Sequence, residues 1–189
     1  MASARVSARQ RLLDAADKLF YSEGVHTVGI DRLIEEAGVA KGSLFYNFTG
    51  KDDVVAAYLA GRDHRRRDRI ARHQLGLEDP IDKLLAVFDA LEEAVLAPGY
   101  RGCAFANANA EALPDSVEAK ALRAFRDWLA GTLLALAEEA GFRDPADVAA
   151  RICLLYDGAV ANSQLDKHPD AVRIAKELAR LVLDTSPRG

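Results

Sequence analysis

The residues GIDRLIEEAGVAKGSLFYNF, at positions 29–48, contain the clearest structural motif in the N-terminal part of this chain. Apolar residues recur at helical spacing from Ile30 to Ala37, where Gly38 interrupts them. The following run predicts a second short helix from about Ala40 to Tyr46. Glycine is expected in the turn because the backbone there has to adopt a positive φ. Two short helices joined by so tight a turn form a helix-turn-helix.

Helix signals flank this motif on both sides. Ser7 and Gln10 have the spacing of a capping box, so a first helix is predicted to begin after Ser7 and to end before Gly24. The sequence TGKD at 49–52 offers another capped start, which leads into a long helix that we expect to join two domains.

The remainder of the chain also has helical periodicity, and alternating strand patterns are missing. Asp-Pro pairs at 79–80 and 144–145 place a capping residue before the proline favoured at the first helical position. Asp115 and Glu118 have the spacing of a further capping box. The last two helices are expected at about 145–167 and 170–184. The prediction is an all-α protein of about nine helices.

Charge is divided unevenly along the chain. The 189 residues carry a formal net charge of −4, but residues 1–75 hold 13 Lys and Arg against 10 Asp and Glu. The rest of the chain is correspondingly acidic. Because the electrostatic footprint of a nucleic-acid binder is local, the N-terminal excess of positive charge permits a polyanion site without proving one.

Cysteine usage and hydropathy narrow the class of protein. Cys103 and Cys153 lie far apart and outside any CxxC pattern, which indicates ordinary reduced thiols rather than a disulfide framework or a cysteine zinc site. No apolar run approaches the roughly 20 residues that span a bilayer, and the first residues lack the apolar core of a signal peptide. We therefore expect a cytoplasmic protein that has no membrane partner, and we expect no cofactor.

The segment YSEGVHTVGIDRLIEEAGVAKGSLFYNFTGKDDVVAAYL closely resembles the tetracycline-repressor (TetR) family, and the resemblance is dense over about residues 7–60. It implies a three-helix DNA-binding domain at 1–51, with the motif at about 29–48, and a helical effector-binding and dimerisation domain at 52–189. It also implies a homodimer that pairs through its last two helices and binds a double-stranded DNA operator. The implied DNA-binding residues are Thr27, Lys41, Gly42, Ser43, Leu44, Tyr46, Asn47 and Lys51.

These residues divide into two expected roles. Phosphate contacts, which position a protein on DNA, are assigned to Lys51, Thr27, Tyr46 and Arg5. Base-edge contacts, which choose the sequence, are assigned to Lys41, Ser43 and Asn47. The chain departs from the family pattern where Val28 and Gly29 replace a frequent Ser or Thr, so Thr27 is expected to supply the helix cap or a phosphate contact. Phe45 replaces a frequent tyrosine and Asn47 a frequent histidine. The alternative is that Leu44 and Tyr46 only pack and that the lysines are solvated.

The second half resembles the family mainly through YRGCAFANANAEAL at 100–113, a glycine-cysteine segment found in one group of TetR-like regulators. Pockets between helices are mostly apolar with a few placed polar groups, so aromatic residues and their neighbours are candidates for an effector site. The effector itself is unidentified and is expected to be a largely apolar small molecule. The candidate lining residues are Phe88, Tyr100, Cys103, Phe105, Asn107, Phe125, Trp128 and Tyr156. Each could instead be a core residue, and Cys103 beside Arg101 could instead be a redox sensor.

The sequence gives less support to two further functional interpretations of the charged residues, a second DNA-binding patch and a metal site. The arginines at 65, 66, 67, 69 and 72 point several ways on a helix, which favours a solvated face with local ion pairs over a second DNA-binding patch. His64, Asp68 and His73 make a poor metal site because only His64 and Asp68 have i, i+4 spacing.

The competing classes are an enzyme on a helical bundle and a DNA-binding module whose second domain serves only for dimerisation. No catalytic triad order, metal-ligand set or phosphate-binding loop favours an enzyme, so no catalytic residue is predicted. The expected function is a repressor that an effector releases from a palindromic operator.

Overall fold

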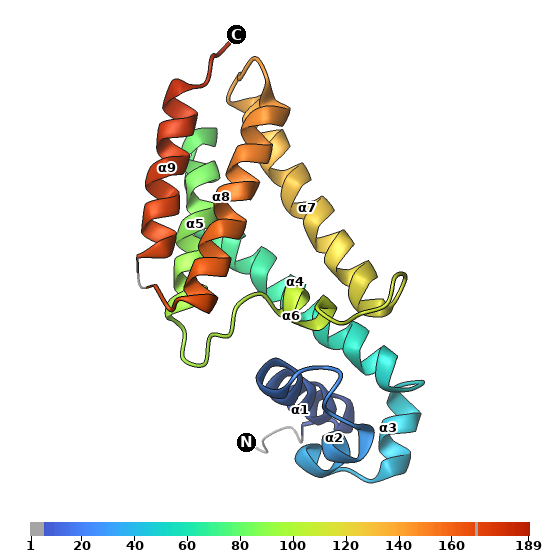
Figure 1. Cartoon of the computed structure of the whole chain (residues 1–189). Coiled ribbons are helices and arrows are strands. Elements are labelled where there is room, and N and C mark those ends of the chain that lie inside the picture. The colour runs from blue at the N-terminus through green and yellow to red at the C-terminus, as the bar shows by residue number, and fades with distance from the viewer. Residues whose placement is uncertain (1–5, 169) are drawn as a thin grey trace, which may run out of the picture. The chain divides into compact units, whose positions relative to one another are not determined.

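The computed structural model describes residues 6–168 and 170–189, and these ranges are helical with no strand among them (Figure 1). The predicted all-α class and number of helices are confirmed for the described residues, and Arg5 lies outside them. The helices are α1 (Ala8–Glu23), α2 (Ile30–Ala37), α3 (Lys41–Asn47), α4 (Lys51–Gln74), α5 (Pro80–Leu96), α6 (Ala104–Asn109), α7 (Val117–Glu139), α8 (Pro145–Leu165) and α9 (Ala171–Thr185).

The chain divides into two compact units that are not contiguous in sequence. The first unit contains the described residues up to Asp63 together with Ala104–Leu122, and the second contains His64–Cys103 and Arg123–Gly189. α4 therefore contributes residues to both units, as does α7. The domain boundary after residue 51 stays a prediction from the sequence.

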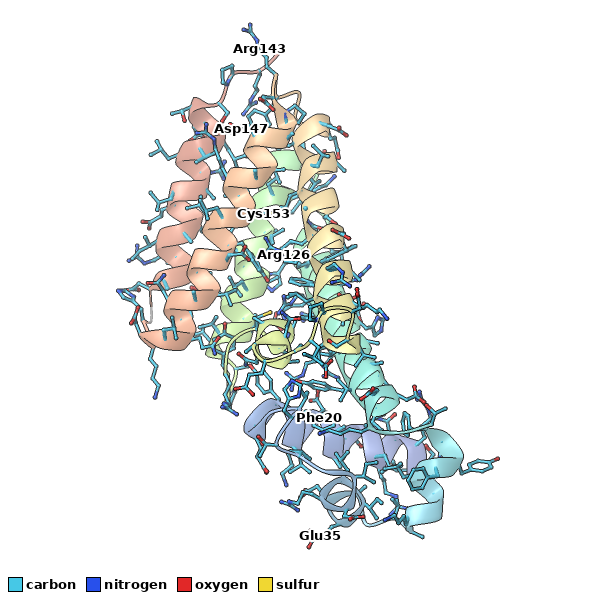
Figure 2. The ribbon with its side chains drawn as sticks, turned by 45° about the vertical axis from the view of Figure 1, so that its right-hand side comes forward. Phe20, Glu35, Arg126, Arg143, Asp147 and Cys153 are labelled. Carbon is cyan, nitrogen blue, oxygen red and sulfur yellow. The ribbon has the colours of Figure 1, made fainter. Side chains whose placement is uncertain are left out.

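In the first unit, α1 packs against α2 and α3 and buries one stripe of apolar side chains. Leu12 and Leu33 are fully buried, and Phe20 meets Tyr58 of α4 edge to face with ring centroids 5.5 Å apart. Arg62 of α4 ties the same region together, since its Nε donates to Asp17 Oδ1 at 2.7 Å. Figure 2 shows Phe20 on α1. These contacts hold the two short helices on a fixed support.

Both Asp-Pro helix starts follow the predicted capping signals, whereas the starts of α1 and α7 depart from them. Asp79 accepts from the backbone N–H of Ile81, and Asp144 accepts from that of Asp147, so both Asp-Pro starts are confirmed. At α1 only half of the capping box forms. Ser7 Oγ accepts from Gln10 N at 3.1 Å, but the Gln10 side chain donates to Asp14 instead of returning to residue 7.

At the start of α7 the predicted capping box is wrong. Asp115 lies at φ 66°, in the left-handed region, and Ser116 Oγ accepts from the backbone N–H of Ala119 at 3.2 Å. The helix therefore begins one residue later than a cap at Asp115 would allow, because the next hydroxyl competes for the same free N–H groups.

In the second unit, α8 packs along α9, and α5 packs against α9 (Figure 1). Phe88 of α5 and Tyr156 of α8 are buried, and their rings meet edge to face at 6.2 Å. Arg126 of α7 forms an ion pair with Asp157 of α8, with Nη1 2.5 Å from Oδ1. Figure 2 shows Arg126 and Cys153 at neighbouring levels of α7 and α8.

No helix in the described ranges is both long enough and apolar enough to cross a membrane.

Candidate functional site

The turn between α2 and α3 has the predicted glycine geometry. Gly38 lies at φ 60° and ψ 41°, which is the left-handed conformation that an L side chain disfavours. The backbone N–H of Val39 donates to the carbonyl of Ile34 at 3.3 Å and so satisfies a carbonyl at the end of α2. Arg11 of α1 donates from Nη1 to the Gly38 carbonyl at 2.9 Å. The backbone of the turn and the hydrogen bond from Arg11 of α1 together fix the angle between the two short helices.

α3 has one buried face and one exposed face. Leu44 is fully buried and Phe48, just after the helix, is 3% exposed, whereas Tyr46 is 90% exposed. The side chain of Leu44 therefore packs in the core, and its predicted DNA contact stays a prediction that would have to come from its backbone. Tyr46 keeps its predicted role as an outward contact.

The polar side chains predicted to read bases are already engaged within the unit. Lys41 Nζ lies 3.2 Å from Asp31 Oδ1 of α2, and the side-chain amide of Asn47 donates to the Ser43 carbonyl at 2.7 Å. Gly42 faces open space, since a Cβ built on it would meet nothing within 4 Å. Base reading by Lys41, Ser43 and Asn47 stays a prediction, and Lys41 and Asn47 each have one donor engaged within the unit.

The two predicted phosphate contacts outside α3 are differently placed. Thr27 is exposed before α2, and α2 has no side-chain cap because Gly29 occupies that position. Of its two predicted roles Thr27 therefore keeps only the phosphate contact. Lys51 is half-buried in the first turn of α4.

Phe45 is the exposed residue of α3 that the predicted contact set omitted. Its side chain is 52% exposed, although it lies directly after the fully buried Leu44. The signal that identifies it is helical phase, because Phe45 follows Lys41 by four residues and so shares the face that begins the recognition helix.

The second unit brings arginines of α4 onto aromatic rings. The guanidinium carbon of Arg66 lies 4.3 Å from the centroid of Phe125, and that of Arg67 lies 4.5 Å from the centroid of Trp128. Both arginines are half-buried, so the predicted solvated face is wrong for them. The sequence pattern missed this because the rings come from α7, far along the chain.

Arg66 also meets the thiol of Cys103. Nη2 of Arg66 lies 3.8 Å from Sγ of Cys103. This thiol therefore has a cation of α4 beside it, in addition to its sequence neighbour Arg101. Burial lowers the pKa of the Arg66 guanidinium, but the neighbouring Tyr156 and Cys103 raise it, and the net direction is upward. Burial raises the pKa of the Tyr156 hydroxyl. Arg66 is consequently a fixed positive charge beside the side chains of Tyr156 and Cys103.

The candidate effector-lining residues fall into both units. Phe88, Tyr100, Cys103, Phe125, Trp128 and Tyr156 belong to the second unit, and Phe105 and Asn107 belong to the first. Phe88, Phe125 and Tyr156 are buried, while Asn107 is exposed. The second unit therefore gathers an aromatic set around Arg66 and Cys103.

A groove of about 270 Å³ follows the outer side of α8 and α9. Its walls are mainly aliphatic, and large apolar side chains along it are exposed, with Leu154 at 73% and Leu178 at 46%. Leu181, further along α9, is 58% exposed. We call Leu154, Ile174, Leu178 and Leu181 the aliphatic stripe. Surfaces of this kind on soluble proteins mark sites of association.

Two sequence patterns match this chain. The pattern of bacterial regulatory proteins of the tetR family matches residues 12–58, and the pattern of the tetracyclin repressor-like C-terminal domain matches residues 80–179. The chain belongs to the TetR family. It is accordingly a DNA-binding transcriptional regulator, and the family is one of regulators rather than enzymes.

The similarity to solved structures extends over nearly the whole chain, whereas the similarity to one characterised regulator is confined to a short segment. The TetR-family transcriptional regulator SCO4454 from Streptomyces coelicolor is 34% identical, with a TM-score of 0.89 over 95% of each chain. A putative TetR transcriptional regulator from Streptomyces avermitilis is 27% identical, with a TM-score of 0.83 over 97% of this chain and 100% of the other. The regulator SrpR of Pseudomonas putida is 41% identical over 56 residues, which cover 30% of this chain and 26% of SrpR.

Within this TetR-family chain, the described residues hold no group of three metal-binding side chains. His64 Nε2 pairs with Asp68 at 3.2 Å, whereas His73 Nε2 lies 2.8 Å from Oε2 of Glu93 on α5. Arg72 also pairs with Glu93, and these two hydrogen bonds lower the pKa of Glu93 to about 2. The histidines of α4 therefore lie against surface carboxylates rather than around a common metal position.

Proposed function

We propose that this TetR-family chain is a repressor that binds a palindromic operator as a homodimer and leaves it when a small-molecule effector binds. The observation that carries the proposal is the exposed face of α3, held at a fixed angle by the left-handed Gly38 and by Arg11. A recognition helix must protrude and be rigidly oriented to enter a major groove. Tyr46 and Lys41 on this face supply outward contacts to the duplex.

The proposed dimer pairs α8 and α9 of two copies. The aliphatic stripe supports this assignment, because four large apolar side chains are exposed there beside small residues such as Gly158 and Ala159. Small residues let helices approach closely, and aliphatic side chains then exclude water from the contact. A dimer is also required by the operator, since two recognition helices must be spaced by about one turn of DNA, roughly 34 to 36 Å or a multiple of it.

The proposed effector binds at the aromatic set of the second unit, around Phe125, Tyr156 and Phe88. α4 supports a mechanism of release because one continuous helix carries Lys51, in the first unit, and Arg66, which contacts this aromatic set. An effector that shifts α4 would change the spacing of the recognition helices. It must bind the DNA-incompetent state more tightly, because only a differential affinity moves the equilibrium.

The first experiment selects genomic DNA fragments with the purified protein at moderate salt and sequences those that bind. We expect enrichment of one palindromic sequence, and we expect Lys51→Ala to recover less DNA of every sequence, since a phosphate contact that is independent of sequence has been removed. Glu23→Ala, an exposed substitution at the end of α1, is the matched control and should leave enrichment intact. Enrichment of no sequence by the wild-type protein would contradict the proposal.

The effector step has its own test. Substrates and products of the enzymes encoded beside the selected operator are added to the protein–DNA complex. The affinity for the operator is then measured at saturating compound. Release by a compound that also raises the melting temperature supports the mechanism. A ligand-saturated protein that holds the operator as tightly as the free protein would contradict it. The absence of thermal shifts across broad libraries would favour a second domain that serves only for dimerisation.

A further inference from the structure

The exposed surface of α3 is unusually apolar for a helix that contacts DNA. Phe45 is 52% exposed and Tyr46 is 90% exposed, and together they form the largest side chains on the outward face. Exposing an aromatic ring to water is unfavourable in proportion to its apolar surface. A partner that covers these rings therefore gains stability that no rearrangement within α3 would supply.

The polar alternatives on this helix are largely committed elsewhere. Lys41 pairs with Asp31 of α2, and the Asn47 amide donates to the Ser43 carbonyl one turn back. Gly42 offers no side chain at all. Direct reading of guanine or adenine by Lys41 or Asn47 competes with these internal hydrogen bonds, whereas an apolar contact by Phe45 has no such competition.

Helical geometry places Phe45 on the same face of α3 as the first residues of that helix. Phe45 follows Lys41 by four residues and Gly42 by three, so the three positions share one face. Side chains on a helix lean toward its N-terminus, and the ring of Phe45 therefore leans toward Gly42. Gly42 has no side chain, and a Cβ built on it would meet nothing within 4 Å, so the surface beside this glycine is open to a partner.

We propose that Phe45 is a specificity-determining residue that packs against the 5-methyl group of a thymine in each operator half-site. The phenyl ring has no polar atom, and the thymine methyl is the apolar group that the major groove presents. Tyr46 differs because its hydroxyl can bind a phosphate oxygen. The inference rests on the proposed operator binding and adds to it the chemical group that is read.

The experiment is a thermodynamic cycle on the operator obtained by selection. Each thymine in turn, with its symmetry mate, is replaced by deoxyuridine, which removes only the methyl group. Affinities are measured for the wild-type protein, for Phe45→Ala and for Phe45→Leu. Thermal unfolding checks that each variant is folded, and Tyr46→Ala is the matched control because it removes the neighbouring aromatic ring.

At one thymine position we expect deoxyuridine to weaken wild-type binding by about fourfold per methyl, hence roughly tenfold or more for a symmetric pair. Phe45→Ala should bind the two duplexes equally, Phe45→Leu should keep part of the difference, and Tyr46→Ala should keep all of it. Equal losses for wild type and Phe45→Ala, or no sensitive thymine, would overturn the assignment. Failure of the selection itself would instead count against operator binding, and the assignment would fall with it.

Discussion

The two units expose apolar side chains of different chemistry. α3 of the first unit exposes two aromatic rings next to Lys41 on a helix of seven residues, whereas α8 and α9 of the second unit expose an aliphatic stripe along a groove. In the second unit, by contrast, the aromatic side chains of Phe88, Phe125 and Tyr156 are buried. Arg66 lies against the Phe125 ring.

The exposure of apolar side chains alone does not indicate the kind of partner that covers them. The chemistry of the exposed side chains does indicate it. Aromatic rings beside cations suit double-stranded DNA, whose major groove exposes base edges and thymine methyl groups between charged phosphate backbones. Branched aliphatic side chains beside small residues suit another helix pair of the same kind. Four measurements test whether the two surfaces differ in this way.

The largest effect is expected at the aliphatic stripe. Leu178→Glu places a charge in the proposed dimer contact, and we expect a monomer in sedimentation and a loss of operator affinity of about 100-fold or more. Leu113→Glu is the matched control, because Leu113 is 76% exposed but lies in the first unit. A Leu178→Glu protein that stays dimeric would show that the two copies meet elsewhere.

The second effect concerns the geometry that presents α3. Gly38→Ala forces a Cβ into the left-handed region and should lower the free energy of unfolding by about 1–2 kcal/mol. Gly42→Ala, four residues later and in a helix, should raise it by roughly 0.5–1 kcal/mol. Chemical denaturation measures both. Equal effects of the two substitutions would mean that the turn tolerates a different conformation.

The third effect tests a phosphate contact in the first unit. Lys51→Ala should weaken binding to operator and to random DNA alike, by roughly threefold to tenfold, and should reduce the salt slope by about 1. Fluorescence anisotropy at several salt concentrations measures this. A selective loss at the operator only would reassign Lys51 to base reading.

The smallest effect is expected for surface ion pairs of the second unit. Glu93 has a folded-state pKa of about 2, held down by hydrogen bonds from Arg72 and His73. A lowered pKa stabilises the fold above the unfolded pKa, and the stabilisation disappears as pH falls toward 2. Glu93→Gln should therefore cost less than about 1 kcal/mol at pH 7, because the group is solvated, and the difference from wild type should shrink below about pH 4. Urea denaturation across pH measures it. A constant difference would exclude the charge as its cause.

The first unit was largely predictable from sequence because its determinants are local. Gly38 took the expected left-handed conformation, and the helical class was correct throughout the described ranges. The side chain of Leu44 was harder to place, since a residue in the middle of a recognition helix can face either way until its packing against α1 and α2 is known. Phe45 was overlooked for the same reason.

The second unit was less predictable because its partners come from distant parts of the chain. Asp79 and Asp144 were correctly recognised as caps, since a cap depends on the next few residues alone. The surroundings of Arg66 and Arg67 were missed, because Phe125 and Trp128 lie about one-third of the chain away. Even locally, Ser116 displaced Asp115 as a cap, which shows that two adjacent capping residues compete on small energy differences.

The return of residues 104–122 to the first unit limits how this regulator can be recombined with others. His26, in the loop before α2, makes a hydrogen bond through Nε2 to the carbonyl of Ala108 at 3.3 Å. A chimaera that transfers only the leading segment up to Asp63 onto a foreign sensor would separate these two groups. The transplantable unit is discontinuous, so an engineered fusion has to carry α6 and its flanking turns along with the helix-turn-helix.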